Sequence, residues 1–275
     1  MSATVALNDP QTLYEHWEQQ QWSPRSIDLA TDQADWRERL SHADKQLVYW
    51  ALCSLMVAEE RITTKFAGLV LAGESEEETT FLATKQVDEA RHMQFYARFQ
   101  NEVIAAPAAI SAHVERSREQ LGEPFAVIFD HALVEAHDRL VADPRDSVAK
   151  VAFVTTYHLV IEATLGLTAF QFITRYLDRQ GLLPGFVEGY GRIHHDEQRH
   201  IGYGVWFLRE AARDPELSET IRGTLHSLLP SVAAALAPPT NDGLEFEALG
   251  ASGEEIRQFA LTGLTRRLKI IGIEL

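Results

Sequence analysis

Residues His194 to Gly204 read HHDEQRHIGYG, and within this segment Glu197 precedes His200 by three positions. Residues three apart lie on one face of an α-helix, so this carboxylate and this imidazole can converge on a single metal ion. One such unit is weak evidence, because Glu and His are common on solvated helix surfaces. The segment becomes informative only if other parts of the chain supply matching donors.

A second Glu-x-x-His unit lies in QVDEARHMQFY, where Glu89 precedes His92. Two further acids stand in apolar surroundings. Glu59 falls in a gap of an apolar stripe with spacings of three and four (Leu52, Leu55, Ile62 and Phe66), whereas Glu60 points about 100° away and is expected in solvent. Glu162 lies within the apolar run YHLVIEATLG. A buried carboxylate is costly unless it has a cation or a hydrogen-bond partner, or takes up a proton.

The order along the chain is a lone Glu, a Glu-x-x-His pair, a second lone Glu and a second pair. If each half forms one helical hairpin, two packed halves give a dinuclear metal site with six ligands: Glu59, Glu89, His92, Glu162, Glu197 and His200. Oxygen donors with one imidazole per ion favour iron or manganese over copper(I) or structural zinc. We expect Asp196 to orient a metal-bound imidazole. His194 and His195 are expected to lie off the ligand face in structural roles.

Helical periodicity covers the whole chain, and no convincing strand pattern competes with it. Ser41, Ser75 and Ser252 each precede an acid by three positions, which is the signal of a helix start. We predict one all-α domain, residues 1–275, built as a four-helix bundle with additional helices. Residues 1–40 are expected to wrap around the bundle, 74–78 to form a solvated first helical turn, 215–275 to add C-terminal helices, and 237–243 to form a loop. The four long helices are expected within 41–73, 75–107, 146–181 and 183–214.

The net charge of the 275 residues is -15 and the pI is about 5.1, so neither nucleic acid nor an anionic membrane surface is a suitable partner. The single cysteine excludes an internal disulfide and a Cys-rich metal site. The N-terminus lacks the pattern of a signal peptide, and no stretch reads as an uninterrupted membrane span. We therefore expect a cytoplasmic protein.

These residues resemble a branch of the ferritin-like superfamily that contains the radical-generating small subunit of class I ribonucleotide reductase and related ligand-binding oxidases. The resemblance covers about residues 10–210, and its most specific motifs are DEARH and DEQRH with their two lone Glu partners. It implies a dioxygen-activating oxidase with manganese at Glu59, Glu89 and His92 and iron at Glu162, Glu197 and His200, or with two irons. Glu89 and Glu197 would then bridge the metals. A bound long-chain fatty acid, a homodimer and an electron donor, which the sequence does not identify, are further expectations.

Tyr157 and Ile62 occupy the positions at which the oxidases form an ether bond during dioxygen activation, although valine is the usual aliphatic residue there. Both valine and isoleucine present a tertiary Cβ–H bond. The spacing raises a geometric problem, because five residues from Tyr157 to Glu162 correspond to about 500° in a straight α-helix. Tyr157 can face the ligands only if the helix is distorted.

Two features keep a reductase small subunit as the alternative. Tyr96, four residues after His92, matches the radical tyrosine, and Trp22 with Asp196 resembles the electron-transfer pair. Against it, the C-terminal LTRRLKIIGIEL predicts an amphipathic helix where such subunits carry a disordered, tyrosine-bearing tail. We favour the oxidase. Iron storage is a third hypothesis, which would require a shorter chain that assembles into a shell.

Overall fold

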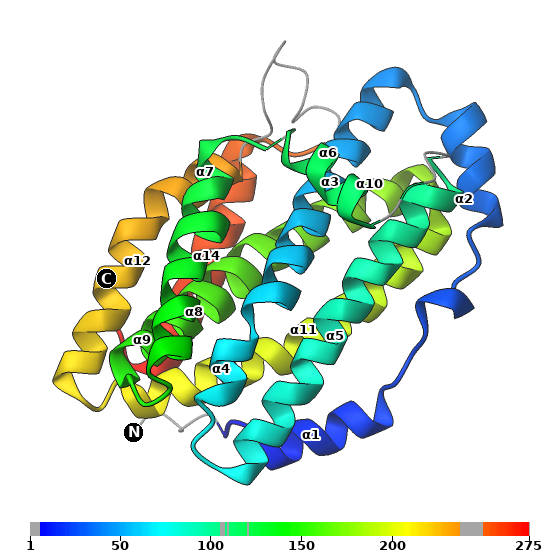
Figure 1. The fold of residues 1–275 in the computed structure, drawn as a ribbon. Helices are drawn as coiled ribbons and strands as arrows, with labels where there is room; N and C mark the ends of the chain where they lie inside the picture. The colour runs from blue at the N-terminus through cyan, green and yellow to red at the C-terminus, as the bar shows by residue number, and fades with distance from the viewer. Residues whose placement is uncertain (1–5, 105–107, 109, 120, 237–249, 275) are drawn as a thin grey trace.

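The computed structural model describes residues 6–104, 108, 110–119, 121–236 and 250–274, and these contain helices and no strand. The predicted all-α bundle is confirmed (Figure 1). Its four long members contact one another in the order expected from two hairpins. They are α3 (His42–Lys65), α5 (Glu76–Glu102), the continuous helix α9–η4–α10 (Ser147–Val154, Thr155–Gly166 and Leu167–Gln180) and α11 (Pro184–Ala211).

Additional helices surround this bundle. Two of them, α12 (Pro215–Ala235) and α14 (Gly253–Ile271), pack against η4 on one side, and α14 also contacts α10 and α11. The C-terminal segment is thus helical, as its amphipathic pattern predicts. The loop expected at 237–243 lies outside the described residues. Five short helices lie between α3 and α9 in the described sequence apart from α5: α4 (Ala67–Leu71), α6 (Ile110–Arg118), α7 (Glu123–Phe125), η3 (Ala126–Ala132) and α8 (Leu133–Ala142).

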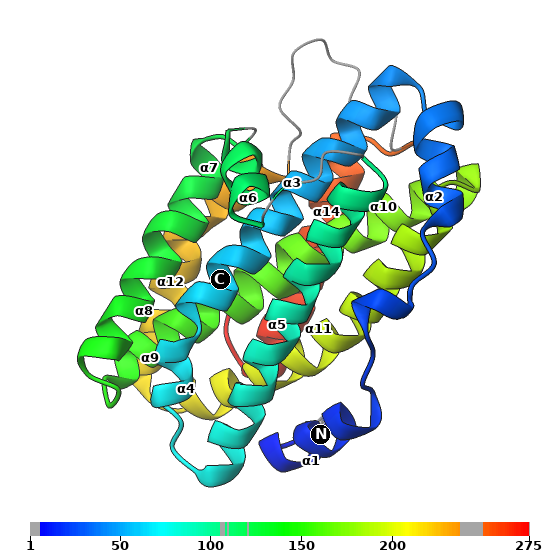
Figure 2. The same cartoon turned by 45° about the vertical axis from the view of Figure 1, so that its right-hand side comes forward.

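The N-terminal segment runs along the outside of the bundle (Figure 2). It comprises α1 (Pro10–Gln19), η1 (Pro24–Ser26), α2 (Ala30–Ala34) and η2 (Asp35–Arg39), of which α1 packs on α5 and α11. The buried Asp32 carboxylate accepts hydrogen bonds from the backbone N–H groups of Gly185 (2.8 Å) and Phe186 (2.7 Å). An acid here satisfies free N–H groups at the start of α11 and complements the helix dipole. The segment therefore fixes the beginning of the helix that carries DEQRH.

Two of the three predicted helix starts form complete capping boxes, at Ser41 and at Ser252. At Ser75 the hydroxyl accepts a hydrogen bond from the Glu78 N–H (3.1 Å), but the Glu78 carboxylate turns inward. Glu78 is 4% exposed and lies 3.0 Å from the buried Lys150 ammonium, and it accepts a hydrogen bond from Tyr203 (2.6 Å). The prediction of a fully solvated turn at 74–78 is therefore wrong for Glu78, because a buried lysine requires a counter-charge.

The α9–η4–α10 helix is buried on most sides and contains a long π-helical stretch, η4. Thr155 to Thr164 are all buried. By length and composition the helix Ser147–Gln180 is apolar enough to cross a membrane, contrary to the sequence expectation, but 78% of its most apolar window is buried inside the protein. Burial on most sides accounts for this composition in a core helix.

Gly204 of α11 allows a close approach to this π-helix. A Cβ atom at position 204 would lie 2.3 Å from the Cβ of His158. Because such a contact is far shorter than van der Waals distance, only glycine fits without movement of one helix. The two helices that carry Glu162 and His200 are thereby held close together.

Candidate metal centre

All six predicted ligands point into one region of the bundle interior. Glu59 comes from α3, Glu89 and His92 from α5, Glu162 from η4, and Glu197 and His200 from α11. Their donor atoms form two overlapping groups within which all atoms lie within 4.8 Å of one another. The first group is Glu59, Glu89, His92 and Glu197, and the second is Glu89, Glu162, Glu197 and His200.

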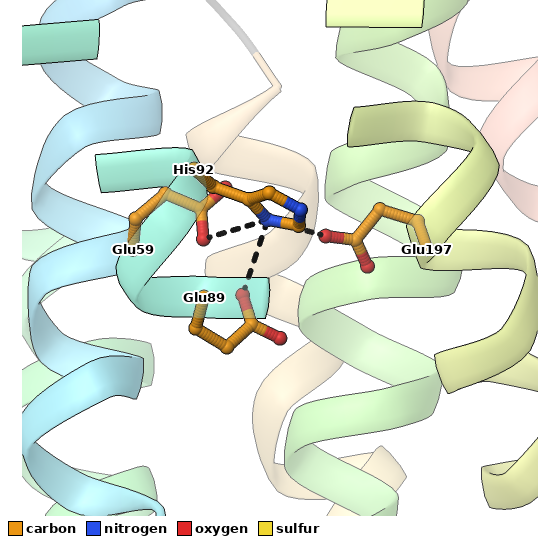
Figure 3. A group of neighbouring side chains, drawn as sticks. All are labelled: Glu59, Glu89, His92 and Glu197. Atoms are coloured by element: carbon orange, nitrogen blue, oxygen red, sulfur yellow. Dashed lines mark ion pairs between the residues drawn. The ribbon is translucent and has the colours of Figure 1, made fainter. Parts of the chain in front are cut away.

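In the first group, three carboxylates surround the Nδ1 atom of His92 (Figure 3). The distances are 3.4 Å to Glu59 Oε2, 3.4 Å to Glu89 Oε2 and 3.5 Å to Glu197 Oε1. The α3 and α5 helices supply one side of the group, and α11 supplies the other. Carboxylate oxygens and one imidazole nitrogen thus face a common point.

In the second group, His200 Nδ1 lies 3.2 Å from Glu89 Oε1, 3.2 Å from Glu162 Oε1 and 3.5 Å from Glu197 Oε2. Glu89 and Glu197 therefore face the two groups with different oxygen atoms. This is the geometry that a carboxylate needs in order to bridge two ions. Glu59 and Glu162, by contrast, each belong to only one of the two groups.

Burial and missing hydrogen bonds show that these residues fit a pair of metal ions. Glu89, His92 and His200 are fully buried, and Glu59 is 6% exposed. Buried polar atoms are normally hydrogen-bonded. Here Glu59 Oε2, Glu89 Oε2, His92 Nδ1, Glu162 Oε2, Glu197 Oε2 and His200 Nδ1 have no hydrogen-bond partner. Coordination of cations would satisfy such a set.

Proton affinity in the cluster is strongly perturbed. Burial raises the pKa of Glu59 well above its usual range, and burial with the charges of Glu162 and Glu89 raises the pKa of Glu197 to about 7. Burial lowers the pKa of both imidazoles, but neighbouring carboxylates outweigh it, so the pKa values of His92 and His200 lie well above their usual value. These shifts favour the protonated forms of the four groups and so reduce the net negative charge of the cluster.

The Nε2 atom of each imidazole, on the opposite side of the ring from Nδ1, contacts an aspartate of the other motif. His92 Nε2 lies 3.1 Å from Asp196 Oδ2, and His200 Nε2 lies 3.2 Å from Asp88 Oδ2. Asp196 also accepts a hydrogen bond from the Trp22 indole (2.8 Å), and Asp88 accepts one from the Trp17 indole (3.0 Å). Such partners orient the ring so that Nδ1 faces the ion.

Trp22 and Asp196 were expected near the centre from the sequence, whereas Asp88 and Trp17 were not. The available signal was the first letter of DEARH, which repeats the Asp of DEQRH. Each motif also supplies one arginine that contacts both aspartates. Arg199 lies 3.1 Å from Asp88 and 2.5 Å from Asp196, whereas Arg91 lies 2.7 Å and 4.0 Å from the same two aspartates.

Lys85 was also missed, although it stands one helical turn before Glu89 on the same face of α5. The side chain is fully buried, with Nζ 2.5 Å from Glu162 Oε1 and 4.0 Å from the centre of the Tyr157 ring. Burial would raise the pKa of Glu162, but the Lys85 charge lowers it to about 2. Glu162 thus has a cationic partner within the protein.

The π-helix resolves the geometric problem at Tyr157. Its hydrogen bonds run from residue i+5 to residue i, so residues five apart lie nearly above one another. Tyr157 and Glu162 therefore share a face of η4, and the Tyr157 hydroxyl donates a hydrogen bond to Glu89. Ile62 is 4% exposed and lies on α3 three residues after Glu59.

A largely apolar cavity of about 140 Å³ adjoins the centre. Glu59, Glu162 and Glu197 border it, as do Ile62 and Tyr96. Its other walls include Leu55, Phe129, Leu165, Phe172 and Ile173. The Tyr96 hydroxyl has no hydrogen-bond partner, and burial raises the pKa of Tyr96 well above its usual range.

The neighbouring residues that were expected to lie outside the ligand set do lie outside it. The carboxylate of Glu60 forms an ion pair with Arg118 (2.8 Å) rather than standing free in solvent. His194 stacks on Phe170 with ring centres 3.8 Å apart, and His195 is exposed. None of the three belongs to either group of candidate ligands.

Comparison with known proteins assigns the chain to a family. The family model of the ribonucleotide reductase small chain matches residues 5–274, and the protein belongs to this family. A variant of an R2-like ligand-binding oxidase with an aerobically reconstituted Mn/Fe cofactor is 25% identical, with a TM-score of 0.84 and 97% of each chain covered. Two further variants of such oxidases with Mn/Fe cofactors, one reconstituted aerobically and one anaerobically, are each 24% identical, with a TM-score of 0.82, covering 97% of this chain and 94% of theirs. The family assignment favours an oxidase or a reductase subunit over iron storage.

Metal binding is expected to release protons and to strengthen as the pH rises. Glu59, Glu197, His92 and His200 all have raised pKa values, so a metal ion must displace their protons. We expect affinity for Mn²⁺ to increase by about tenfold or more from pH 6 to pH 8. Calorimetric titration in buffers of different ionisation enthalpy measures both quantities. Affinity independent of pH, without proton release, would contradict this account.

Glu59 and Glu60 provide a matched pair of substitutions. Glu59→Gln removes an anionic donor from the first group and is expected to weaken binding of one metal by more than about tenfold. Glu60→Gln affects only the ion pair with Arg118, and should leave metal stoichiometry at the wild-type value. Elemental analysis after equilibrium dialysis distinguishes the two variants. Greater loss in Glu60→Gln than in Glu59→Gln would show that the ligand assignment on α3 is wrong.

Proposed function

We propose that the protein is a dinuclear metal oxidase that activates dioxygen and uses its oxidising power on a C–H bond. The convergence of six donor residues, five of them buried and two of them facing both groups, is the observation that carries this proposal. Glu59, Glu89 and His92 would hold manganese, and Glu162, Glu197 and His200 would hold iron, or both sites would hold iron. The Mn/Fe cofactors of the similar oxidases support the mixed pair.

The protein's own side chains would position the ions and exclude water. Asp196 and Asp88 orient the two imidazoles, and Glu89 and Glu197, whose two oxygens face different groups, would each hold both ions. The metal pair, when bound, supplies the redox chemistry for the reduction of dioxygen. Burial by the bundle keeps this chemistry away from bulk water.

The C–H bond that we propose as the target lies within the protein, at the Cβ atom of Ile62. Formation of an ether bond between the Tyr157 oxygen and this carbon removes the phenolic hydrogen and the Cβ hydrogen. Loss of these two hydrogens releases two electrons and two protons. With one electron from each divalent metal, which would become trivalent, and two protons from solvent, they balance the four-electron, four-proton reduction of dioxygen to two waters. Tyr157 is suitably placed, because its hydroxyl contacts the bridging candidate Glu89, and Ile62 lies one turn from Glu59.

Peptide mass spectrometry tests this cross-link. After aerobic assembly with Mn²⁺ and Fe²⁺, the tryptic peptides that contain Tyr157 and Ile62 should be joined with the loss of two hydrogens. Anaerobically assembled protein and the Tyr157→Phe variant should yield separate peptides. Separate peptides from fully metallated, oxygen-exposed wild type would refute the cross-link and leave the metal site in place.

A reductase small subunit is the second candidate, and the Trp22–Asp196–His92 chain of contacts favours it. Tyr96, buried beside the cavity and four residues after His92, would then store a radical. Electron paramagnetic resonance on the oxygen-exposed sample distinguishes the functions. A tyrosyl radical signal that disappears in Tyr96→Phe would favour the reductase, whereas its absence together with the cross-link would favour the oxidase.

The cavity suggests a long-chain fatty acid as the bound ligand. Apolar side chains would surround the alkyl chain, and the carboxylate would approach the ions held at Glu59, Glu162 and Glu197. Extraction of the denatured, purified protein followed by mass spectrometry should yield up to one fatty acid per chain. Leu165→Trp, which narrows the cavity, should reduce this amount. Equal lipid content in both proteins would place any bound lipid elsewhere.

A further inference from the structure

Lys85 places a positive charge on one side of the metal centre. Its Nζ atom lies 2.5 Å from Glu162 Oε1, which belongs to the second group alone. It also lies 3.8 Å from Glu89 Oε1, the Glu89 oxygen that faces His200. Both contacts are therefore made on the side of the second group, at a fully buried side chain.

The two neighbouring arginines do not produce this asymmetry. Arg91 and Arg199 pair with Asp88 and Asp196, which stand behind different imidazoles. Their charge is thus divided between the two groups. The charge of Lys85, in contrast, acts directly on Glu162.

A lysine in this position weakens a metal site in two ways. The ammonium donates a hydrogen bond to Glu162 Oε1, the oxygen that also lies nearest His200 Nδ1, and so reduces the lone-pair density that Glu162 can offer a metal. In addition, two cations repel each other more strongly in a buried site than in water, because the surroundings screen them poorly. In the first group the ion-pair contact of Lys85 is with Glu89, at 3.8 Å, and it is made through Oε1, the oxygen that faces His200 of the second group.

We propose that Lys85 sets the order of metal loading, so that the group with Glu59 and His92 binds the first divalent ion and the group with Glu162 and His200 binds the second more weakly. This inference rests on the proposed dinuclear function. Lys85 acts as a positioning residue through Glu162 rather than as a ligand. A centre of two different metals requires two sites of unequal metal affinity, because otherwise each ion would bind equally well at either site.

The test titrates metal-free protein with Mn²⁺ under anaerobic conditions in competition with a chromophoric chelator. Wild type should bind two ions with dissociation constants at least tenfold apart. Lys85→Met, which removes the charge and keeps an unbranched side chain only one atom shorter, should tighten the second step at least tenfold and leave the first step nearly unchanged. Lys150→Met is the matched control, because Lys150 is also buried but pairs with Glu74 and Glu78, and it should preserve both steps.

A second measurement needs no variant. Wild-type crystals loaded with one equivalent of Mn²⁺ should show anomalous scattering at the Glu59 and His92 group. Equal occupancy of both groups, or a Lys85→Met isotherm identical to wild type, would overturn the role of Lys85 while leaving the dinuclear site intact. Failure of wild type to bind metal would overturn both this inference and the proposed function. If Lys85→Met does not fold, Lys85→Gln, which also removes the charge, takes its place in the titration with the same expected result.

Discussion

The structure depends on holding four glutamates together in the interior of a helical bundle. Their mutual repulsion and the cost of removing them from water would oppose folding if all were charged and unpaired. This cost is reduced by the raised pKa values of Glu59 and Glu197, by the raised pKa values of the two imidazoles, and by the Lys85 ammonium at Glu162. Metal ions that bind these residues therefore compete with protons for the same atoms.

Crossed contacts between the two motifs convert this cluster into a rigid unit. The Asp of each motif holds the His of the other, and the arginines bind both aspartates. Neither α5 nor α11 can shift alone without breaking contacts on both sides. The two tryptophans extend the same network to the N-terminal segment, whose Asp32 also holds the start of α11. The N-terminal segment thus stabilises the centre by holding the two aspartates that orient the imidazoles.

Much of this arrangement follows from local sequence. The spacing of Glu89 and His92 and the apolar surroundings of Glu59 and Glu162 suffice to predict both the bundle and the convergence of these side chains, because each depends on helical period alone. Contacts between particular side chains of distant segments cannot be predicted in this way. Lys85 and Glu162 are 77 residues apart, and Asp88 and His200 are 112 apart, so no periodicity reveals their contact. Likewise, the inward turn of Glu78 follows from Lys150, whose burial depends on tertiary packing.

The π-helix has a consequence for how this chain can change during evolution. Its wider turn places Tyr157 over Glu162, whereas an α-helical turn would separate them by a large rotation. Removing one residue between them would restore the common winding and swing every earlier side chain of that helix around the axis. Because Gly204 also fits closely against His158, such a deletion would disturb two helices at once. Substitutions here can accumulate singly, whereas changes in length require a coordinated rearrangement of both helices.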